Sequence, residues 1–400
     1  MELHEDMDIK EFCKRYAVPD RHNTNSFKWD LLKEKFGDED LIPMWVADMD
    51  FKAPECVVDA IVKRAEHGVF GYAFTPDSYY KAVADWEERH FGYRPDTKKI
   101  RVTHGVVSAL FWSVDMYTEP GDAVIILTPV YNQFANAVRT TGRRLISCDL
   151  DCDKGIFTFD ADKFEKSIVD NDVKLYIMCS PHNPAGRVWK QDELTDMLEI
   201  CRKHGVLVVS DEIHHDLVFD GHKHIPTASL CGGKYKDMVI TLSASSKTFN
   251  LATCLTSNVI IDNERLLKIW DDFTARYFHV EDNVFGLAAV EAALKGGEDW
   301  YDGMKKTIWH NYEIFKDALG KWPDIYVSPL EGTYLMFVDF RKVIPADECR
   351  AFIQDKCRIA ANYGENYGEN FKGFVRFNLA APPETIKKAI DNIVRELKKL

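Results

Sequence analysis

The stretch SASSKTFNLA, residues 243–252, follows the short apolar run Met238–Leu242 and places Lys247 directly after small residues, three of them serines. An apolar run of this length bounded by small polar residues is typical of a buried strand that ends at a loop. A lysine at such a place loses much of its hydration, and an ion pair or a covalent bond must compensate for the loss. The stretch therefore predicts a partner for Lys247, although most lysines are solvated loop residues.

From about residue 100, short apolar runs alternate with amphipathic stretches on both sides of this lysine. The runs that predict strands are 123–127, 174–179, 206–210 and 238–242, and the stretches that predict helices are 105–117 and 192–205. Such alternation indicates an α/β fold with a parallel sheet that helices cover on both faces. Ligands of open parallel sheets bind beyond the carboxyl ends of the strands, so candidate functional residues are expected directly after each run.

The C-terminal part has a different pattern, which predicts a second, α+β domain. Strands are expected over 333–340 and 374–380, followed by a closing helix from Thr385. One apolar stripe marks that helix: Ile386, Ala389, Ile390, Ile393, Leu397 and Leu400. The local duplication YGENYGEN (363–370) is rich in turn formers and predicts a loop, not a repeat architecture.

Composition narrows the class of partner. The net charge is −13, with acidic and basic residues interspersed, which argues against nucleic acid or an anionic membrane as a partner and favours small molecules. Ten cysteines without a CxxC pair indicate a reducing, cytoplasmic compartment. The acidic start MELHEDMDIK has no secretory signal pattern, and no run approaches the roughly 18 apolar residues of a membrane span.

Three further polar residues follow predicted strands or lie on one. Asn183 lies in SPHNPAGRVW (180–189), Asp211 begins DEIHHDL, and Arg376 alternates with apolar neighbours in GFVRFNLA. Each has an ordinary structural explanation: a turn residue, a helix N-cap and an exposed strand face, respectively. Their combination with Lys247, in this order along the chain, is what those explanations do not predict.

With these four residues in place, the chain resembles the pyridoxal-phosphate enzymes of the aspartate aminotransferase fold. The resemblance covers nearly the whole length and rests on MWVADMDF (44–51), FGY (70–72), THGVVSAL (103–110), TPVYNQF (128–134), SPHNPAGRVW, DEIHHDL, SSKTFNLA (245–252) and FVRFNLA (374–380). Within that fold, WVADMDF, NPAGRVW, DEIH and SKTFN are similar to the bacterial cystathionine β-lyase or cysteine C–S lyase branch, the maltose-regulon-modulator type.

The resemblance implies a domain organisation. A large domain over 51–285 would bind pyridoxal 5'-phosphate on a mostly parallel sheet of the seven-stranded type, flanked by helices. Residues 1–50 would form an N-terminal arm and part of a small α+β domain, which 286–400 would complete.

The resemblance also implies roles for the polar residues around the cofactor ring. Lys247 would bond to the cofactor aldehyde and later move the substrate's Cα proton. Asp211 would stabilise the protonated pyridine nitrogen, Asn183 would donate to the phenolic oxygen, and His214 would lie close to that ring. Two further residues would complete the site: Tyr131 on the ring face, unless it is a core tyrosine, and Arg376 on the substrate's α-carboxylate.

The cofactor phosphate would lie at the start of the 105–117 helix. The backbone amides of Gly105, Val106 and Val107 are placed to receive it. Tyr72 would reach it from the neighbouring subunit of a homodimer with shared active sites; without the resemblance, the cluster of Phe70, Tyr72 and Phe74 would be assigned to the core. Ala244 and Leu255 replace a hydroxyl residue and an arginine that many relatives place on the phosphate, which leaves Ser243, Ser245 and Ser246 as donors between which spacing does not decide.

The leading expectation is a lyase that catalyses β-elimination of L-cystathionine or similar cysteine S-conjugates to a thiol, pyruvate and ammonia. An aminotransferase that uses the same residues is the first alternative, and a pyridoxal-phosphate-binding regulatory protein with little turnover is the second. An S-x-x-K serine hydrolase built on Lys247 is excluded by Ala244, and neither a dinucleotide nor a P-loop phosphate motif is present. The histidines of 214–224 lack metal-ligand spacing and are expected to be solvated, so no metal is expected.

Overall fold

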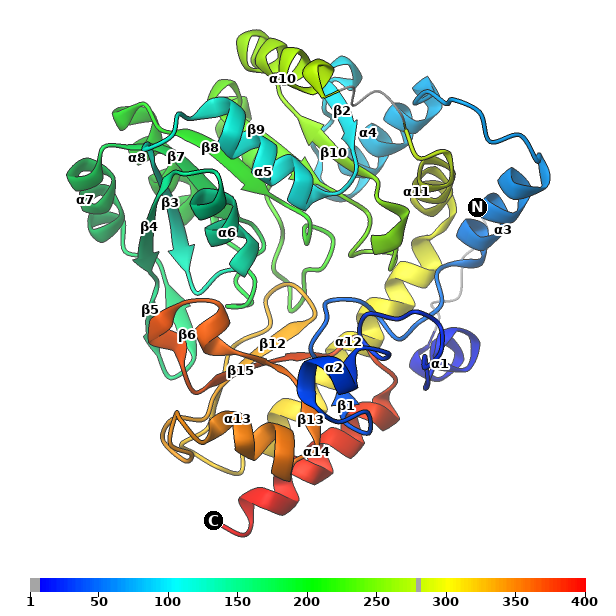
Figure 1. Cartoon of the computed structure of the whole chain (residues 1–400), viewed down its shortest axis with the longest axis vertical. Helices are drawn as coiled ribbons and strands as arrows, with labels where there is room; N and C mark the ends of the chain where they lie inside the picture. The colour runs from blue at the N-terminus through cyan, green and yellow to red at the C-terminus, as the bar shows by residue number, and fades with distance from the viewer. Residues whose placement is uncertain (1–7, 278–281) are drawn as a thin grey trace.

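The computed structural model describes residues 8–277 and 282–400. Figure 1 shows two parts: one is built around a large sheet and the other around a smaller sheet that includes the C-terminal strands. The first seven residues of the predicted N-terminal segment 1–50 lie outside the described residues, as do residues 278–281 of the predicted segment 51–285. The boundaries at 50 and 285 stay predictions.

The large sheet has seven strands in the order β2-β10-β9-β8-β7-β3-β4. Their bounds are β2 (Ile100–Thr103), β10 (Ser257–Ile260), β9 (Val239–Ser243), β8 (Leu207–Asp211), β7 (Val173–Cys179), β3 (Ala123–Thr128) and β4 (Arg144–Asp149). All neighbouring pairs are parallel except the two that β10 makes, which are antiparallel. The predicted mostly parallel sheet is confirmed.

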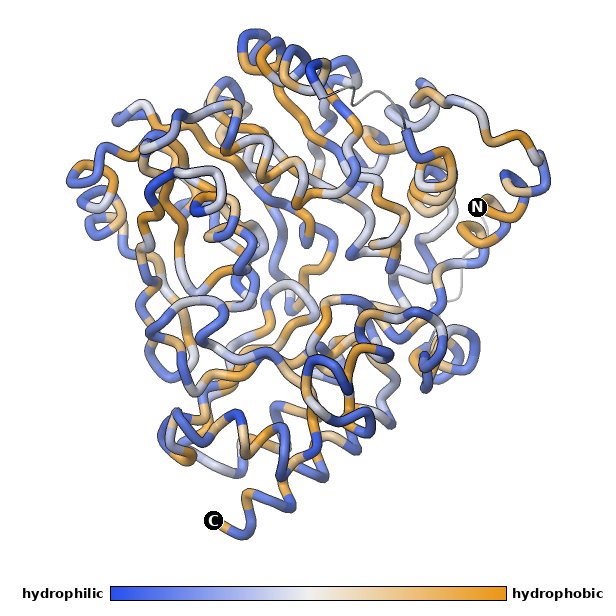
Figure 2. Tube along the Cα trace, in the orientation of Figure 1, coloured by the Kyte–Doolittle hydropathy of each residue, from blue (hydrophilic) through white to orange (hydrophobic). Residues whose placement is uncertain are grey.

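Helices cover both faces of this sheet because successive residues of a strand point to opposite sides. Val124 and Ile126 of β3 pack into one cluster with the helices of the first face, whereas Ile125 and Leu127 pack into a second cluster on the other face. The first face is covered by α5 (Val106–Tyr117), α6 (Asn132–Thr140) and α10 (Glu264–Arg276), and the second by α7 (Ala161–Asn171) and α8 (Gln191–His204). Figure 2 shows hydrophobic residues along these strands. Burying each large aliphatic side chain stabilises the fold by about 1.5–3 kcal/mol.

The smaller sheet is antiparallel, with four strands in the order β11-β12-β15-β14. Its strands are β11 (Tyr326–Val327), β12 (Leu335–Asp339), β15 (Phe374–Asn378) and β14 (Asn362–Tyr363), and the long helices beside it are α12 (Glu298–Leu319) and α14 (Pro383–Leu397). The predicted stripe of α14 is buried from Ile386 to Leu397. Leu400 was wrongly included in it, because the helix ends at Leu397 and Leu400 is 70% exposed.

The N-terminal segment joins the two parts. α1 (Ile9–Tyr16) contacts α12, α2 (Leu32–Phe36) follows it, and β1 (Ile42–Pro43) pairs with β13 (Ile359–Ala360). Residues 44–51 then bond to both parts: the carbonyl of Met44 accepts from the Asn378 amide, and the Met49 amide donates to the Asn250 side chain. Three helices complete this end of the molecule: α3 (Glu55–Glu66), α4 (Asp77–Phe91) and α11 (Val284–Gly296), which contacts both others.

The remaining short elements are β5 (Asp151–Asp153), β6 (Ile156–Thr158), α9 (Leu230–Gly233) and α13 (Cys349–Ala351). Within residues 8–277 and 282–400, no helix combines the length and apolar character needed to cross a membrane. All ten cysteines fall in the described part of the chain and are free thiols.

Candidate active site

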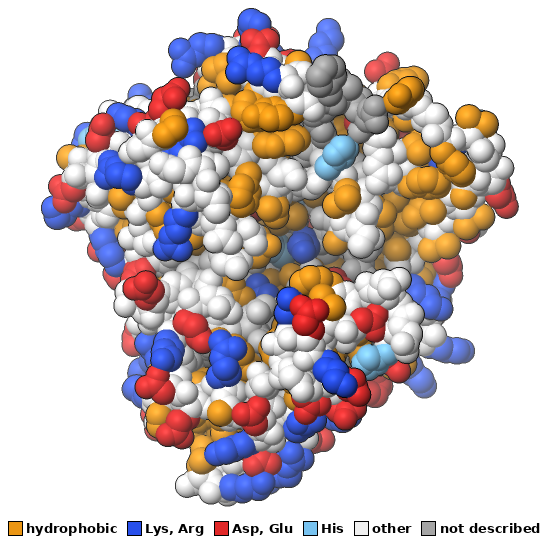
Figure 3. All heavy atoms as spheres, in the orientation of Figure 1, with side chains coloured by type: hydrophobic (Ala, Val, Ile, Leu, Met, Phe, Trp, Pro, Cys, Tyr) orange, Lys and Arg blue, Asp and Glu red, His pale blue; other side chains and the backbone are white. Residues whose placement is uncertain are grey.

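The predicted polar residues gather at the carboxyl edge of the large sheet. β9, β8 and β7 are neighbours, and their register pairs Asp211 with Cys179 on one side and with Leu242 on the other. The segments that follow these strands carry Asn183, His214 and Lys247. In the space-filling view, the face is hollowed between the two parts of the molecule, and basic and histidine side chains are visible in its depth (Figure 3).

Lys247 lies on the turn after β9 and is partly buried. Its Nζ donates to the carbonyl oxygen of Ala47 at 2.7 Å. Burial lowers the pKa of this amine to about 8, the cation of Arg376 acts in the same direction, and the carboxylates of Asp48 and Asp211 oppose them. The amine can therefore be free of its proton near neutral pH, as a nucleophile or a base must be.

Asp211 is a buried carboxyl group at the end of β8. One of its oxygens accepts from the amide of Ile213 at 3.1 Å. Burial raises its pKa to about 7, because that hydrogen bond and the nearby Lys247 only partly offset the lost hydration. A cationic group placed against Asp211 would therefore be strongly favoured.

His214 is buried, three residues after Asp211, within electrostatic reach of Lys247 and Arg376. Burial, together with the positive charges of Lys247 and Arg376, holds the pKa of its imidazole well below the usual range. Its Nδ1 is buried without a hydrogen-bond partner, and its ring contacts Tyr334 edge-on at 6.0 Å. A buried polar atom without a partner is costly, so Nδ1 indicates that a further group belongs next to it.

Arg376 lies on β15, and its guanidinium crosses from the small sheet to the large one. Nη1 donates to Oδ1 of the buried Asn183 at 3.1 Å, and Nη2 donates to the carbonyl of Trp45 at 2.8 Å. Its Nε is buried without a hydrogen-bond partner. The alternative that Arg376 belongs to an exposed strand face is wrong, because Arg376 and Asn378 are as buried as the apolar residues between which they alternate.

Tyr131 lies next to Asn183 at the start of α6. Its amide donates to the Asn183 carbonyl at 3.1 Å, and its ring is partly buried. Burial raises the pKa of the Tyr131 hydroxyl. The carboxylate of Asp211 acts in the same direction, and the cation of Arg376 opposes it. Tyr131 is therefore within electrostatic reach of both Arg376 and Asp211, as a residue on the face of a ring bound between them would be.

The predicted phosphate site is formed by the start of α5 and the turn that carries Lys247. Gly105 precedes α5 with a φ of 104°, which favours glycine, and the space where a Cβ would stand is open. Val106, the first residue of α5, is buried, whereas Val107 is exposed. The amides of all three residues belong to the first turn, where they lack intrahelical partners.

The three serines before Lys247 differ in their surroundings. Ser243 and Ser245 are buried and, with Ala244, line a cavity of about 10 Å³ whose other walls include Glu87 and His215. Ser246 is more exposed. This difference favours Ser246 as the donor that faces a ligand at the open edge of the sheet.

Within a single chain, Tyr72 does not lie with the other predicted site residues. It lies between α3 and α4, and its side chain is 93% exposed. Phe70 and Phe74 beside it are also largely exposed, so the alternative that this cluster is core is wrong. A residue of the partner subunit would be expected to show such exposure in a single chain.

Sequence reasoning missed two tyrosines that line this site. Tyr367 lies in the duplicated segment 363–370, is buried, and has its ring 5.1 Å from the guanidinium of Arg376. Tyr334 is buried and donates to the Ala47 carbonyl at 2.9 Å. Neither tyrosine has a spacing signal, since both are placed by contacts between distant segments.

Two histidines of 214–224, His215 and His224, were wrongly expected to be solvated. His214, His215 and His224 are buried, and Nε2 of His224 hydrogen-bonds to Glu212 at 2.9 Å. Over the described ranges 8–277 and 282–400, no three His, Cys, Asp or Glu side chains gather as a metal site.

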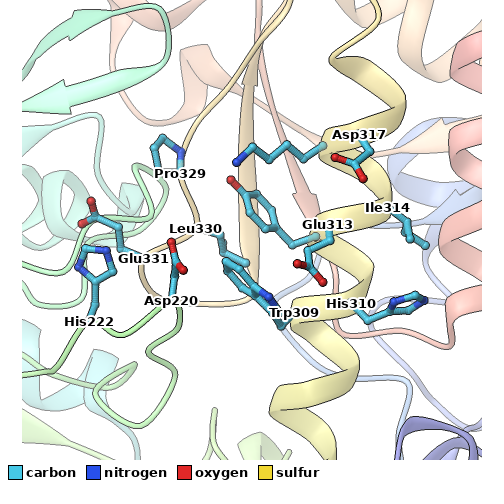
Figure 4. A pocket seen from close by; sticks show the side chains of 12 residues that line it. Asp220, His222, Trp309, His310, Glu313, Ile314, Asp317, Pro329, Leu330 and Glu331 are labelled. Carbon is cyan, nitrogen blue, oxygen red and sulfur yellow. The ribbon is translucent and has the colours of Figure 1, made fainter.

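A separate cavity of about 550 Å³ lies beside α12 and includes none of the predicted site residues. Figure 4 shows Trp309 and Glu313 of α12 on one side, with Asp220, His222 and Glu331 on the other. Five of its twelve lining residues are charged.

Known proteins resemble this chain over nearly its whole length. It is 37% identical to cystathionine beta-lyase PatB of Bacillus subtilis, over 94% of this chain and 97% of that protein. The structure superimposes on PLP-bound cystalysin from Treponema denticola with a TM-score of 0.91, at 35% identity over 96% and 98% of the two chains. It also matches a PLP-bound C-S lyase from Staphylococcus hominis with a TM-score of 0.89, at 32% identity over 95% and 97%. The sequence profile described as aminotransferase class I and II matches residues 39–393, and the chain belongs to that family.

Proposed function

We propose that this protein is a pyridoxal-phosphate-dependent carbon–sulfur lyase that catalyses β-elimination of L-cystathionine or related cysteine S-conjugates. The observation that carries the proposal is the environment of Lys247: a partly buried amine of lowered pKa, beside a buried carboxyl group and a buried guanidinium. The names of the relatives give the reaction its direction, since PatB is a cystathionine beta-lyase and the Staphylococcus hominis protein is a C-S lyase.

The residues of the site fit the cofactor. Asp211 is a buried acid whose charge lacks compensation, and a protonated pyridine nitrogen would supply it. Nδ1 of His214 is an orphaned polar atom in the same place, and the free amides at the start of α5 suit a phosphate. When bound, pyridoxal phosphate acts as a sink for the electrons that a broken bond at the substrate's Cα leaves behind.

Each residue has a role in binding or proton transfer. Arg376 holds the substrate's α-carboxylate, because a guanidinium is always charged and pairs with a carboxylate through two hydrogen bonds. Lys247 Nζ holds the cofactor between turnovers and accepts the proton from Cα. Asp211 keeps the ring cationic, Asn183 donates to its phenolic oxygen, and Tyr131 covers its face.

The overall reaction balances as an elimination followed by hydrolysis. The Cα proton passes to Lys247, the bond between Cβ and sulfur breaks, and the electron pair leaves on the thiolate, which takes up a proton. Water then converts the remaining three-carbon unit to pyruvate and ammonia.

The test is to mix purified protein with L-cystathionine and follow products over many turnovers. Continuous release of pyruvate and free thiol in equal amounts is the expected result. One equivalent of keto acid per site, with the cofactor left in its amine form, would instead indicate an aminotransferase. Absence of turnover with cystathionine and with smaller cysteine thioethers would favour a binding role without catalysis.

We further infer a homodimer with shared sites, in which Tyr72 reaches the phosphate of the partner subunit. A group of apolar side chains in and after α3 is exposed in the single chain, and a partner subunit would cover it. Its members are Val58, Val62, Val69, Phe70, Tyr72 and Phe74. Figure 3 shows hydrophobic side chains gathered on this side of the molecule. The ten free thiols are consistent with the cytoplasm as its location.

A further inference from the structure

A buried cluster of charged residues lies beneath the turn that carries Lys247. Glu87 comes from α4, and His215 and Asp216 follow β8; their side chains are 9%, 5% and 1% exposed. Charged side chains are rarely buried so completely without a reason, because the loss of hydration is costly. The chemistry proposed above uses none of the three.

Both ring nitrogens of His215 lie against oxygen atoms that can accept a proton. Nδ1 lies within hydrogen-bond distance of the Glu212 carbonyl, which can only accept, so Nδ1 is a donor. Nε2 lies 3.4 Å from an oxygen of Glu87 and 3.4 Å from an oxygen of Asp216. An imidazolium between two carboxylates satisfies these contacts. A neutral ring would satisfy them only beside a protonated carboxyl group, and burial raises the pKa of Glu87 to about 7.

The local charges agree with this geometry. Burial alone would lower the pKa of His215, but Asp216 and Glu87 outweigh burial and raise it to about 9. Other groups near the cluster are Glu212 and His224 from the same stretch of chain, Tyr93 after α4, and Tyr301 and Lys305 of α12, which interact with Asp216. Glu212 is occupied by its own hydrogen bonds to His224, Ser210 and Thr227.

Asp216 connects this cluster to the turn. One oxygen accepts from Nε1 of Trp86 at 2.8 Å, and the other accepts from Oγ1 of Thr248 at 2.5 Å. Its backbone carbonyl also accepts from the Tyr301 hydroxyl at 2.6 Å. Asp216 is thus fixed by α4 and α12, and it in turn fixes Thr248, which is fully buried and directly follows Lys247.

The cluster also faces the same turn across a small cavity. The cavity of about 10 Å³ that Ser243, Ala244 and Ser245 line is closed by Glu87 and His215. It has room for about one water molecule, with polar groups on both sides. The chain before Lys247 therefore faces the cluster across this cavity, and the chain after Lys247 is hydrogen-bonded to it through Thr248.

We propose that Glu87, His215 and Asp216 are positioning residues that hold Lys247 in place through the hydroxyl of Thr248. The role assigned to Lys247 rests on the proposed function, but the anchoring of its turn does not. Catalytic groups need placement within about 0.5 Å, and a turn held by one buried, charge-assisted hydrogen bond meets that need without contact to the ligand.

The variants separate anchoring from packing. Thr248→Val keeps the shape of the side chain and removes the hydroxyl, Thr248→Ser keeps the hydroxyl, and His215→Gln removes the cation. Thr307→Val is the matched control, because Thr307 is also fully buried and uses its hydroxyl on the backbone of its own helix, α12.

The deciding measurement is the pH dependence of acetylation of Lys247 by acetic anhydride, in full-length protein without cofactor, quantified by peptide mass. The wild-type midpoint is expected near 8. In Thr248→Val and His215→Gln a looser, better hydrated amine should raise the midpoint by roughly half a pH unit or more. Thr248→Ser and Thr307→Val should keep it.

Kinetics with cofactor give the second measurement. Thr248→Val should lower kcat about tenfold with KM within about twofold, since misplacement affects the reacting amine more than substrate binding. A Thr248→Val midpoint and kcat equal to those of the wild type would overturn the proposal. If the wild type proves not to cleave thioethers, the proposed function fails, while the acetylation midpoints still decide the anchoring.

Discussion

Lys247 donates to the carbonyl oxygen of Ala47 at 2.7 Å, and the hydroxyl of Tyr334 donates to the same oxygen at 2.9 Å. One carbonyl of the N-terminal segment thereby joins the turn after β9 to the small sheet. The candidate nucleophile therefore lies where both parts of the molecule meet, so its surroundings depend on how the whole chain folds.

Replacing the amine tests the centre of the site. Lys247→Ala should reduce pyruvate release from cystathionine by about 10³-fold or more, because both the attachment of the cofactor and the proton transfer are lost. Lys268→Ala, on the exposed side of α10, is the matched control and should behave as wild type. Borohydride reduction followed by peptide mass mapping should label Lys247 in the wild type, and labelling elsewhere would contradict the assignment.

Arg376 should determine substrate binding. Arg376→Lys keeps a positive charge but loses the fork of two donors, so kcat/KM should fall about 100-fold, mainly through KM. Arg202→Lys, on the surface of α8, provides the control for the same exchange. Steady-state kinetics with cystathionine measure both; an unchanged KM would show that another group holds the carboxylate.

Asp211 should make the stability of the cofactor-free protein depend on pH. Its pKa is raised from 3.8 to about 7 in the folded state, so the neutral carboxyl group is compatible with burial and the ionised one is not. The stability that the neutral Asp211 carboxyl group contributes is fully present below about pH 4 and is lost as pH rises through 7. Asp211→Asn should remove this loss and raise the free energy of unfolding at pH 8 by about 1–3 kcal/mol, with little effect at pH 4.

Urea unfolding at the two pH values measures this effect. The same variant should lose most of its lyase activity, because its amide cannot hold the cofactor ring cationic. An Asp211→Asn protein that is less stable than the wild type at pH 8 would contradict the burial argument.

The residues that the sequence could locate are those tied to strand ends. Asn183, Asp211 and Lys247 follow apolar runs whose lengths and order predict neighbouring parallel strands, so their shared edge could be inferred. Arg376 was a candidate from its place on a predicted strand, but its role came only from the resemblance, because alternation on its strand fits an exposed face equally well. Apolar runs predicted four of the seven strands, β3, β7, β8 and β9, whereas the number seven came from the resemblance. The outer strands β2 and β4 and the antiparallel β10, whose short run SNVI gives no strong signal, were not predicted from the residues.

The rest of the site depends on contacts that no local pattern encodes. Tyr367 comes from a segment that predicts only a turn, and the carbonyls of Trp45 and Ala47 carry no side-chain signal at all. His215 was assigned to a solvated loop because histidine spacing was examined for metals, whereas its partner Glu87 lies on a helix far away in the sequence. Such long-range pairs become visible only after folding.

Shared active sites predict that two inactive variants restore each other. Tyr72 is 93% exposed in a single chain, whereas Lys247 lies at the edge of the large sheet, so each site of a dimer would combine Lys247 of one subunit with Tyr72 of the other. A heterodimer of Tyr72→Ala and Lys247→Ala then has one site with both residues intact and one with neither. Equal mixing with random pairing should restore about a quarter of wild-type activity, because half of the dimers are mixed and each has one working site.

The measurement is pyruvate release after co-refolding or co-expression of the two variants with different affinity tags, with the mixed dimer isolated through both tags. Each variant alone should stay far below the mixture, which excludes residual activity as the source. A doubly tagged dimer that is as inactive as its parents would show that Tyr72 and Lys247 act within the same chain or that Tyr72 has no role at the phosphate.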